Sequence, residues 1–218
     1  MIRQFGRRQE MKQPYKLKDG SIVPGCTTIC NMLDKPQLID WAWKLGKQGK
    51  DWRAERDNAG DIGTLAHAMI MGYWKEEWPT LQQYPKEQLE AAMIPYNTFL
   101  ENIAKKQLYT PVLIEQPLVS EKLRFGGTPD FYGLHYLCPN LADIKTSNGV
   151  YESHWIQLAG YDILLREAGY SIKKYTIWWL PKDGRFEAFT RTDLRREKRI
   201  FKYLLSIYKE RKANEPPF

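Results

Sequence analysis

The spacing of hydrophobic residues changes near residue 108 of this 218-residue chain, and this change constrains the fold more than any other feature. Before it, apolar side chains recur at helical spacing, as Leu89, Met93, Tyr96 and Leu100 do. After it, short runs rich in branched and aromatic residues predict β-strands. The sequence therefore predicts an α/β fold with a helical N-terminal region.

The expected elements form one domain over residues 1–218, with a hairpin and helices over about 1–108 and a sheet core with a last helix over about 109–212. Gly169 follows the helix expected between the strands and predicts its C-terminal cap. In chain order we expect a hairpin over 15–29, helices within 35–60, 61–78 and 86–106, strands within 110–120, 124–136 and 141–147, a helix over 151–169, strands within 173–180 and 184–191, and a basic helix over about 193–211.

Positive charge is concentrated at the two ends of the chain. Residues 1–18 carry six Lys and Arg against one Glu, and residues 191–212 carry nine against three acids. Because the formal net charge of the whole chain is only +7, the centre is mildly acidic. Basic ends around an acidic centre fit a phosphate-binding rim around a cation site, although two solvated basic segments give the same pattern.

Cysteine usage and hydropathy limit the cellular setting. The three cysteines Cys26, Cys30 and Cys138 form no CxxC pair, which favours a reducing, cytoplasmic location over a disulfide framework. No run of eighteen apolar residues is present, and no apolar segment follows the first charged residues. We therefore expect neither a membrane span nor a signal peptide.

Three charged residues lie inside the strand-like segment 125–147, where strands normally avoid them. Asp143 and Lys145 alternate with apolar residues, so both side chains should point to one face. Asp130 comes from the neighbouring strand and should converge with Asp143. Two carboxylates held close together favour a bound Mg²⁺ or Mn²⁺, whereas a simple Asp–Lys ion pair is the alternative.

Other polar residues are placed to reach the same point. Glu115 is an acid in the preceding apolar run, and His67 follows Gly63 by four residues on one helix face. His67 suits a metal ligand or a hydrogen-bonded core histidine. His154, Gln157 and Tyr161 form a polar stripe on the helix that follows Lys145, so this stripe should return over the site.

These motifs, taken in order, resemble the RecB-like branch of the PD-(D/E)XK nuclease superfamily, including its phage-type exonucleases. The matching residues are Gly63 to His67, Glu115, Gly127 to Asp130, Asp143 to Lys145, and Gln157 to Tyr161. The resemblance covers roughly residues 60–190. It implies a restriction-endonuclease-like core, with a central mixed β-sheet flanked by helices. Because no cysteine follows Cys138, the iron–sulfur cluster of some relatives is expected to be absent.

The resemblance also assigns roles to individual residues. It implies that one or two Mg²⁺ or Mn²⁺ ions are held by His67, Asp130, Asp143 and the backbone carbonyl of Ile144. Lys145 would position the attacking water, and Glu115 would support the site or bind a second ion. Gln157 and Tyr161 would fix Lys145 or the scissile phosphate. Thr27, Thr28, Thr146 and Ser147 are further candidates for phosphate contact.

The implied activity is hydrolysis of DNA phosphodiester bonds, most readily from single-stranded or duplex ends. Arg196, Arg199 and Lys202 of the basic last helix are candidates for DNA binding. Five tryptophans of the helical half could stack on unpaired bases or form core. The alternatives are a structure- or site-specific endonuclease, a non-catalytic nucleic-acid-binding subunit, and a hydrolase of small phosphorylated substrates. The resemblance does not determine whether a recombination protein or a single-strand-binding protein is a partner.

Overall fold

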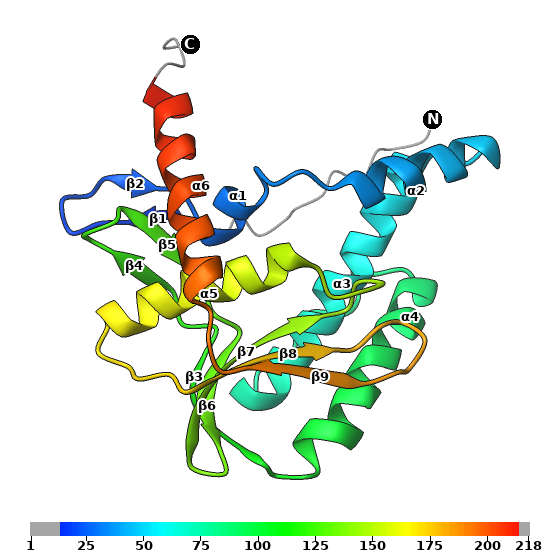
Figure 1. Cartoon of the computed structure of the whole chain (residues 1–218). Coiled ribbons are helices and arrows are strands. Elements are labelled where there is room, and N and C mark those ends of the chain that lie inside the picture. The colour runs from blue at the N-terminus through cyan, green and yellow to red at the C-terminus, as the bar shows by residue number, and fades with distance from the viewer. Residues whose placement is uncertain (1–13, 214–218) are drawn as a thin grey trace.

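The computed structural model describes residues 14–213, and its centre is a five-stranded mixed sheet with strand order β3-β6-β7-β8-β9 (Figure 1). Only β7 and β8 pair in parallel, while every other neighbouring pair in this sheet is antiparallel. The strands are β3 (Tyr109–Ile114), β6 (Phe131–His135), β7 (Cys138–Lys145), β8 (Lys174–Trp179) and β9 (Glu187–Arg191).

Helices cover both faces of this sheet. The helices are α1 (Cys26–Cys30), α2 (Pro36–Lys47), α3 (Trp52–Lys75), α4 (Lys86–Phe99), the π-helical turn η1 (Leu100–Ala104), α5 (Glu152–Glu167) and α6 (Arg195–Ala213). Two small two-stranded sheets complete the fold, formed by β1 (Tyr15–Lys16) with β2 (Ile22–Val23) and by β4 (Leu118–Ser120) with β5 (Phe125–Gly127).

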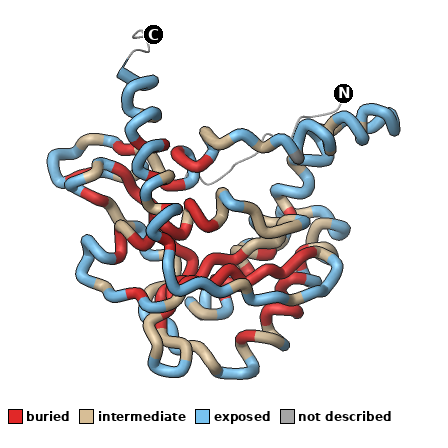
Figure 2. Tube along the Cα trace, in the orientation of Figure 1, coloured by how far each residue is buried: buried red, intermediate tan, exposed pale blue. Residues whose placement is uncertain are grey.

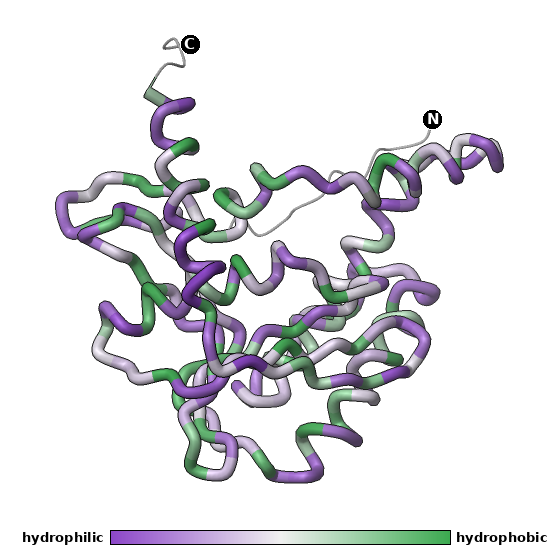
Figure 3. Tube along the Cα trace, viewed as in Figure 1, coloured by the Kyte–Doolittle hydropathy of each residue, from purple (hydrophilic) through white to green (hydrophobic). Residues whose placement is uncertain are grey.

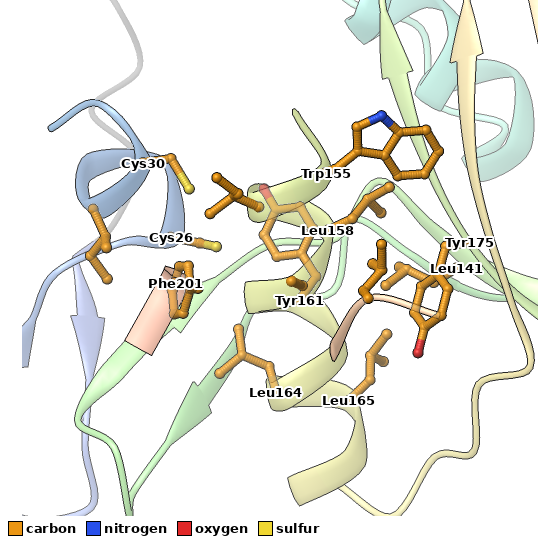
Figure 4. Packing of buried hydrophobic residues seen from close by; sticks show 14 of the residues in the cluster. Cys26, Cys30, Leu141, Trp155, Leu158, Tyr161, Leu164, Leu165, Tyr175 and Phe201 are labelled. Atoms are coloured by element: carbon orange, nitrogen blue, oxygen red, sulfur yellow. The ribbon is translucent and has the colours of Figure 1, made fainter. Parts of the chain in front are cut away.

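Alternation along β7 divides the interior into two cores, which Figure 2 shows as buried segments on both sides of the sheet. Leu141 packs with α1, α5 and α6, while Ala142 and Ile144 pack with α3 and α4 on the opposite face. Figure 4 shows the first core, in which the side chains of Cys26 and Cys30 face α5. Asp143 shares the face of Leu141, so it points toward α5.

The chain connects β7 to β8 through α5, because parallel neighbours need a crossover and cannot be joined by a tight turn. Gly169 follows α5 with a φ of 91°, a conformation that glycine adopts without strain, so the predicted cap is confirmed. The strands β8 and β9 and the last helix also lie where the sequence predicts them.

Three expected elements differ from the prediction. Residues 26–29 belong to α1 and not to the hairpin, whose strands end at Val23. A single helix, α3, runs through Gly60 where two helices were expected to meet. The expected strand over 124–136 is divided into β5 and β6, which belong to different sheets, and the break falls at Pro129, which has no N–H to donate.

Two further expectations concern the buried face of α4 and the presence of a membrane-spanning helix. Met93 was expected on the inner stripe of α4 but is 39% exposed, and Ala92, Tyr96 and Phe99 provide the buried face. Within residues 14–213, no helix combines the length and apolar character needed to cross a bilayer.

Candidate active site

Asp143 and Lys145 lie at the C-terminal end of β7 and point to the same side of the sheet. The Asp143 side chain is 1% exposed, and its Oδ2 lies 2.5 Å from Nζ of Lys145. Both partners of this ion pair are therefore held in an interior where charge is costly. The side chains that surround them decide how the pair is stabilised.

Asp143 is a buried carboxylate without adequate hydrogen bonds. Within the described part of the chain, no donor reaches either of its oxygens in hydrogen-bond geometry, and Lys145 approaches Oδ2 only as a close ionic neighbour. Burial raises the pKa of Asp143 to about 6, although the positive charge of Lys145 opposes the shift. The negative charge of Asp130 adds to it. An additional cation would relieve this arrangement.

Asp130 lies immediately before β6, and not inside a strand as predicted. Its Oδ2 accepts a hydrogen bond of 2.8 Å from the backbone N–H of Ile144, which brings the carboxylate to β7. Its Oδ1 lies 3.0 Å from Nε2 of His67. Burial alone would raise the pKa of Asp130, but His67, Lys145 and the Ile144 N–H lower it overall. Asp130 is therefore kept ionised beside Asp143.

His67 connects two acids. Besides Asp130, it places Nδ1 at 3.4 Å from Oε1 of Glu115. Burial would lower the pKa of His67, yet the two carboxylates raise it overall. Glu115 follows the end of β3, where a strand position was expected, and it adopts a positive φ of 46°. This backbone conformation is unusual for a residue other than glycine and is often associated with functional sites.

Lys75 is a site residue that the sequence patterns did not indicate. Its Nζ lies 2.6 Å from Oε2 of Glu115, so Glu115 contacts two basic side chains of α3. Gly63, His67 and Lys75 are separated by multiples of four residues on this helix. This spacing places them near one face and is the signal that could have revealed Lys75.

Gln157 of α5 holds Lys145 from the other side. Its Oε1 accepts a hydrogen bond of 3.0 Å from Lys145 Nζ. Its Nε2 donates to Tyr161 Oη at 2.8 Å and to Thr27 Oγ1 at 3.2 Å. These bonds fix which end of the amide faces Lys145. The structure thus brings the predicted Gln157 onto Lys145 and the predicted Tyr161 onto Gln157, and it places Thr27 against the same amide.

Two glycines of the motifs permit this close packing. A β-carbon on Gly63 would lie 3.0 Å from Oγ1 of Thr146, so the glycine lets α3 approach the end of β7. A β-carbon on Gly127 would lie 2.9 Å from the ring of Tyr161. A side chain at either position would displace a neighbour of the site.

The remaining predicted residues are distributed differently. Thr146 lies against Gly63, whereas Ser147 bonds locally to the carbonyl of Gly149. The basic residues of α6 are exposed on its outer surface, outside the group of side chains around Asp143, and one of them forms an ion pair of 2.7 Å with Glu152. The basic residues concerned are Arg196, Arg199 and Lys202. The basic N-terminal residues 1–13 lie outside the described residues.

The five tryptophans of the helical half differ in their burial. Trp74 packs against Phe99 and Phe131 and belongs with the second core. Trp43 and Trp78 are each 60% exposed. The prediction of core therefore fits Trp74, whereas Trp41 and Trp52 are half-buried. Packing of the interior does not account for the exposed rings of Trp43 and Trp78.

The donor set fits a magnesium-type cation, although it is not a complete cage of side chains. Among residues 14–213, no three His, Cys, Asp or Glu side chains form a group ready to hold a metal ion. Mg²⁺ commonly uses one or two carboxylates and keeps several waters, which Asp130 and Asp143 can satisfy. The buried oxygens of Asp143 that lack hydrogen bonds are the specific observation in favour of such an ion. His67 contacts Asp130 directly and therefore orients this carboxylate.

The start of α5 makes the stability of the protein sensitive to acid. Nδ1 of His154 accepts a 3.2 Å hydrogen bond from the N–H of Tyr151, and a protonated ring cannot accept it. Burial, assisted by the charges of Lys145 and Lys35, lowers the pKa of His154 to about 3. The unfolded chain takes up this proton below about pH 6.5 while the folded chain does not, so stability is lost as pH falls from 6.5 toward 3.

We expect His154→Gln, which keeps an acceptor but does not titrate, to lose less stability than the parent between pH 7 and pH 5. The expected difference is about 1–2 kcal/mol in the free energy of unfolding, measured by urea denaturation at both pH values. Equal losses in the two proteins would show that His154 is not the acid-sensitive group.

Comparisons with known proteins add distant resemblances of fold. A scan against models of protein families finds no match, and a search of curated proteins finds no relative. A solved structure of a candidate exonuclease from Eubacterium rectale matches 69% of this chain and 65% of its own length, with 10% identity and a TM-score of 0.46. The structure of SSO0001 matches 74% of this chain and 77% of its own, with 16% identity and a TM-score of 0.36. This chain thus spans just under two thirds of the first of these proteins.

Proposed function

We propose that this protein is a Mg²⁺- or Mn²⁺-dependent nuclease that hydrolyses phosphodiester bonds in DNA, with exonuclease action from DNA ends. One observation carries the proposal: a buried Asp143 whose oxygens lack hydrogen bonds lies beside a lysine that Gln157 holds in place. An ion pair with a purely structural role would not need a second buried carboxylate, Asp130, at the same strand end.

Asp130 and Asp143 would hold the cation, together with the backbone carbonyl of Ile144. When bound, such an ion polarises a phosphate oxygen and lowers the pKa of water. Asp130 is suited to this role because His67 and the Ile144 N–H fix both of its oxygens in place. Glu115 and Lys75 lie behind His67 and set the charge of this side of the site.

Lys145 would orient the attacking water and stabilise charge that develops on the phosphate. An ammonium group has three N–H donors. Gln157 takes one of them and Asp143 is a close ionic neighbour, so donors remain for the water or the phosphate. Burial lowers the pKa of Lys145, but Asp143 and Asp130 raise it overall, so the group stays charged and acts as a donor.

The basic outer surface of α6 would provide a track for the DNA backbone. Arg199 and Lys202 are exposed there, and Arg196 remains 64% exposed despite its ion pair with Glu152. Phosphate contacts of this kind position a substrate without reading its sequence. The preference for ends rests on the resemblance to exonucleases that the motifs carry.

The test compares end-labelled linear DNA with covalently closed circular DNA, each incubated with Mg²⁺, Mn²⁺ or EDTA. We expect linear DNA to be shortened from its ends with either metal, closed circles to be spared, and EDTA to stop the reaction. Rapid nicking of closed circles at rates that match linear DNA would instead favour a structure- or site-specific endonuclease. Absence of cleavage under every condition would contradict the proposed function.

A further inference from the structure

Helix α2 and the start of α3 form an arm that projects from the domain at the upper right of Figure 1. The arm is defined as residues 36–56. Every residue of this arm whose burial is described is exposed or half-buried, as the trace in Figure 2 shows. Its apolar side chains Leu38 and Ile39 are 45% and 67% exposed. A helical segment without a buried face gains little stability from the domain, so its sequence is not explained by the core.

Tryptophans and cations alternate on this arm. Trp43 is 60% exposed, and Nζ of Lys47 lies 3.8 Å from the centre of its ring. The guanidinium groups of Arg53 and Arg56 lie 4.8 Å and 5.2 Å from the ring of Trp52. Each ring is therefore accompanied by positive charge that could contact a phosphate next to a stacked base.

The net positive charge of the arm indicates a negatively charged partner. Residues 36–56 contain five Lys and Arg against three acids, and the carboxylate of Asp51 is already used to cap α3. Figure 3 shows hydrophobic and hydrophilic residues alternating along the trace of the arm. A second copy of the chain would bring the same net positive charge on its own arm, which disfavours pairing of two arms. A polyanion that carries exposed aromatic rings would match both the positive charge and the tryptophan side chains of the arm.

We infer that the arm binds single-stranded nucleic acid by stacking unpaired bases on Trp43 and Trp52 while the adjacent cations contact phosphates. This inference rests on the proposed function and specifies the form of its substrate. Trp52 and His67 lie on the same helix, fifteen residues apart. That separation is about 22 Å along α3, a distance that strands of several nucleotides cover in known single-strand sites.

The experiment uses the full-length chain carrying Asp143→Asn, so that the probe survives. A fluorescein-labelled 15-nucleotide oligo(dT) and a blunt duplex of the same length are titrated separately, with fluorescence anisotropy as the measurement. In the variant Trp43→Ala/Trp52→Ala, we expect affinity for oligo(dT) to fall at least about tenfold, since each stacked base contributes substantially. Affinity for the duplex should change by less than about threefold.

Trp78→Ala is the matched control. Trp78 is as exposed as Trp43, but it contacts Tyr96 and follows the far end of α3, and no cation of the described residues lies over its ring. We expect this variant to bind oligo(dT) like the parent, and circular dichroism should show that both variants are folded. An equal loss with Trp78→Ala, or no loss with the arm variant, overturns the inference.

Three further outcomes distinguish strand binding by the arm from dimerisation and from the proposed catalysis. If arm substitutions convert a dimer into a monomer in sedimentation and leave oligo(dT) binding unchanged, the arm binds a second copy and the inference fails. If the protein with Asp143 intact cleaves DNA but the arm variant binds oligo(dT) like the parent, the inference fails while the proposed function stands. If the parent binds oligo(dT) through the arm yet never cleaves DNA, the proposed function fails and single-strand binding by the arm stands.

Discussion

Asp143→Asn is expected to reduce DNA cleavage by about a hundredfold to a thousandfold in saturating Mg²⁺ or Mn²⁺. The substitution keeps the size of the buried side chain but removes the negative charge that would hold the cation. Losing a single charge-stabilising group in an active site commonly costs a factor of about 10²–10³. The measurement is the initial rate on end-labelled linear DNA.

The fold of this variant should remain intact. The introduced amide would lose the ion pair with Lys145, but the substitution would also remove a buried charge whose oxygens have no hydrogen bonds, and these effects oppose each other. Asp162→Asn is the control, because Asp162 is also buried and paired with a lysine, Lys198, away from the proposed site. Cleavage by Asp143→Asn at the parental rate would exclude Asp143 from catalysis.

Lys145→Ala is expected to lower the cleavage rate by about 10²-fold or more without reducing metal affinity. The variant lacks the donor that Gln157 and Asp143 hold in position, and no neighbouring cation of the described site replaces it, since Lys75 is paired with Glu115. Metal affinity, measured by calorimetry, is expected to hold or rise because a competing positive charge next to Asp143 is removed.

Lys198→Ala provides a closely matched comparison. The Lys198 side chain is 24% exposed and lies 2.5 Å from Asp162, while the Lys145 side chain is 18% exposed and lies at the same distance from Asp143. Lys198 joins α6 to α5, so its removal should lower the unfolding temperature and leave cleavage near the parental rate. Similar losses of cleavage in both variants would indicate that Lys145 acts only through stability.

Local signals were enough to predict the elements next to the site. The alternation of residues placed Asp143 and Lys145 on one face of β7, and Gly169 marked the end of α5. These features depend on neighbours within a few residues, which a sequence pattern records directly. The order of such elements predicts an α/β fold, whereas the mixed sheet with helices on both faces was implied by the resemblance.

Features that depend on contacts between distant segments were harder to predict from the sequence. Asp130 was expected inside a strand because the run 128–136 is rich in aromatic and branched residues, yet the chain changes sheets at Pro129. The helix break expected at Gly60 is absent because one glycine costs only about 1 kcal/mol, which the long helix α3 accommodates. Lys75 was missed because its partner Glu115 is forty residues away. The change of sheet at Pro129 and the pairing of Lys75 with Glu115 depend on contacts between segments that are distant in the sequence.

The continuity of α3 has a mechanical consequence. Its 24 residues give a rod of about 36 Å, with the tryptophan arm at one end, His67 along its length and Lys75 at the other end. Gly63 sets this rod close against Thr146 at the end of β7. Because α3 is uninterrupted and its residues from Ile62 to Gly72 are fixed in the core, the arm is a rigid extension of the domain, held at a set distance from His67.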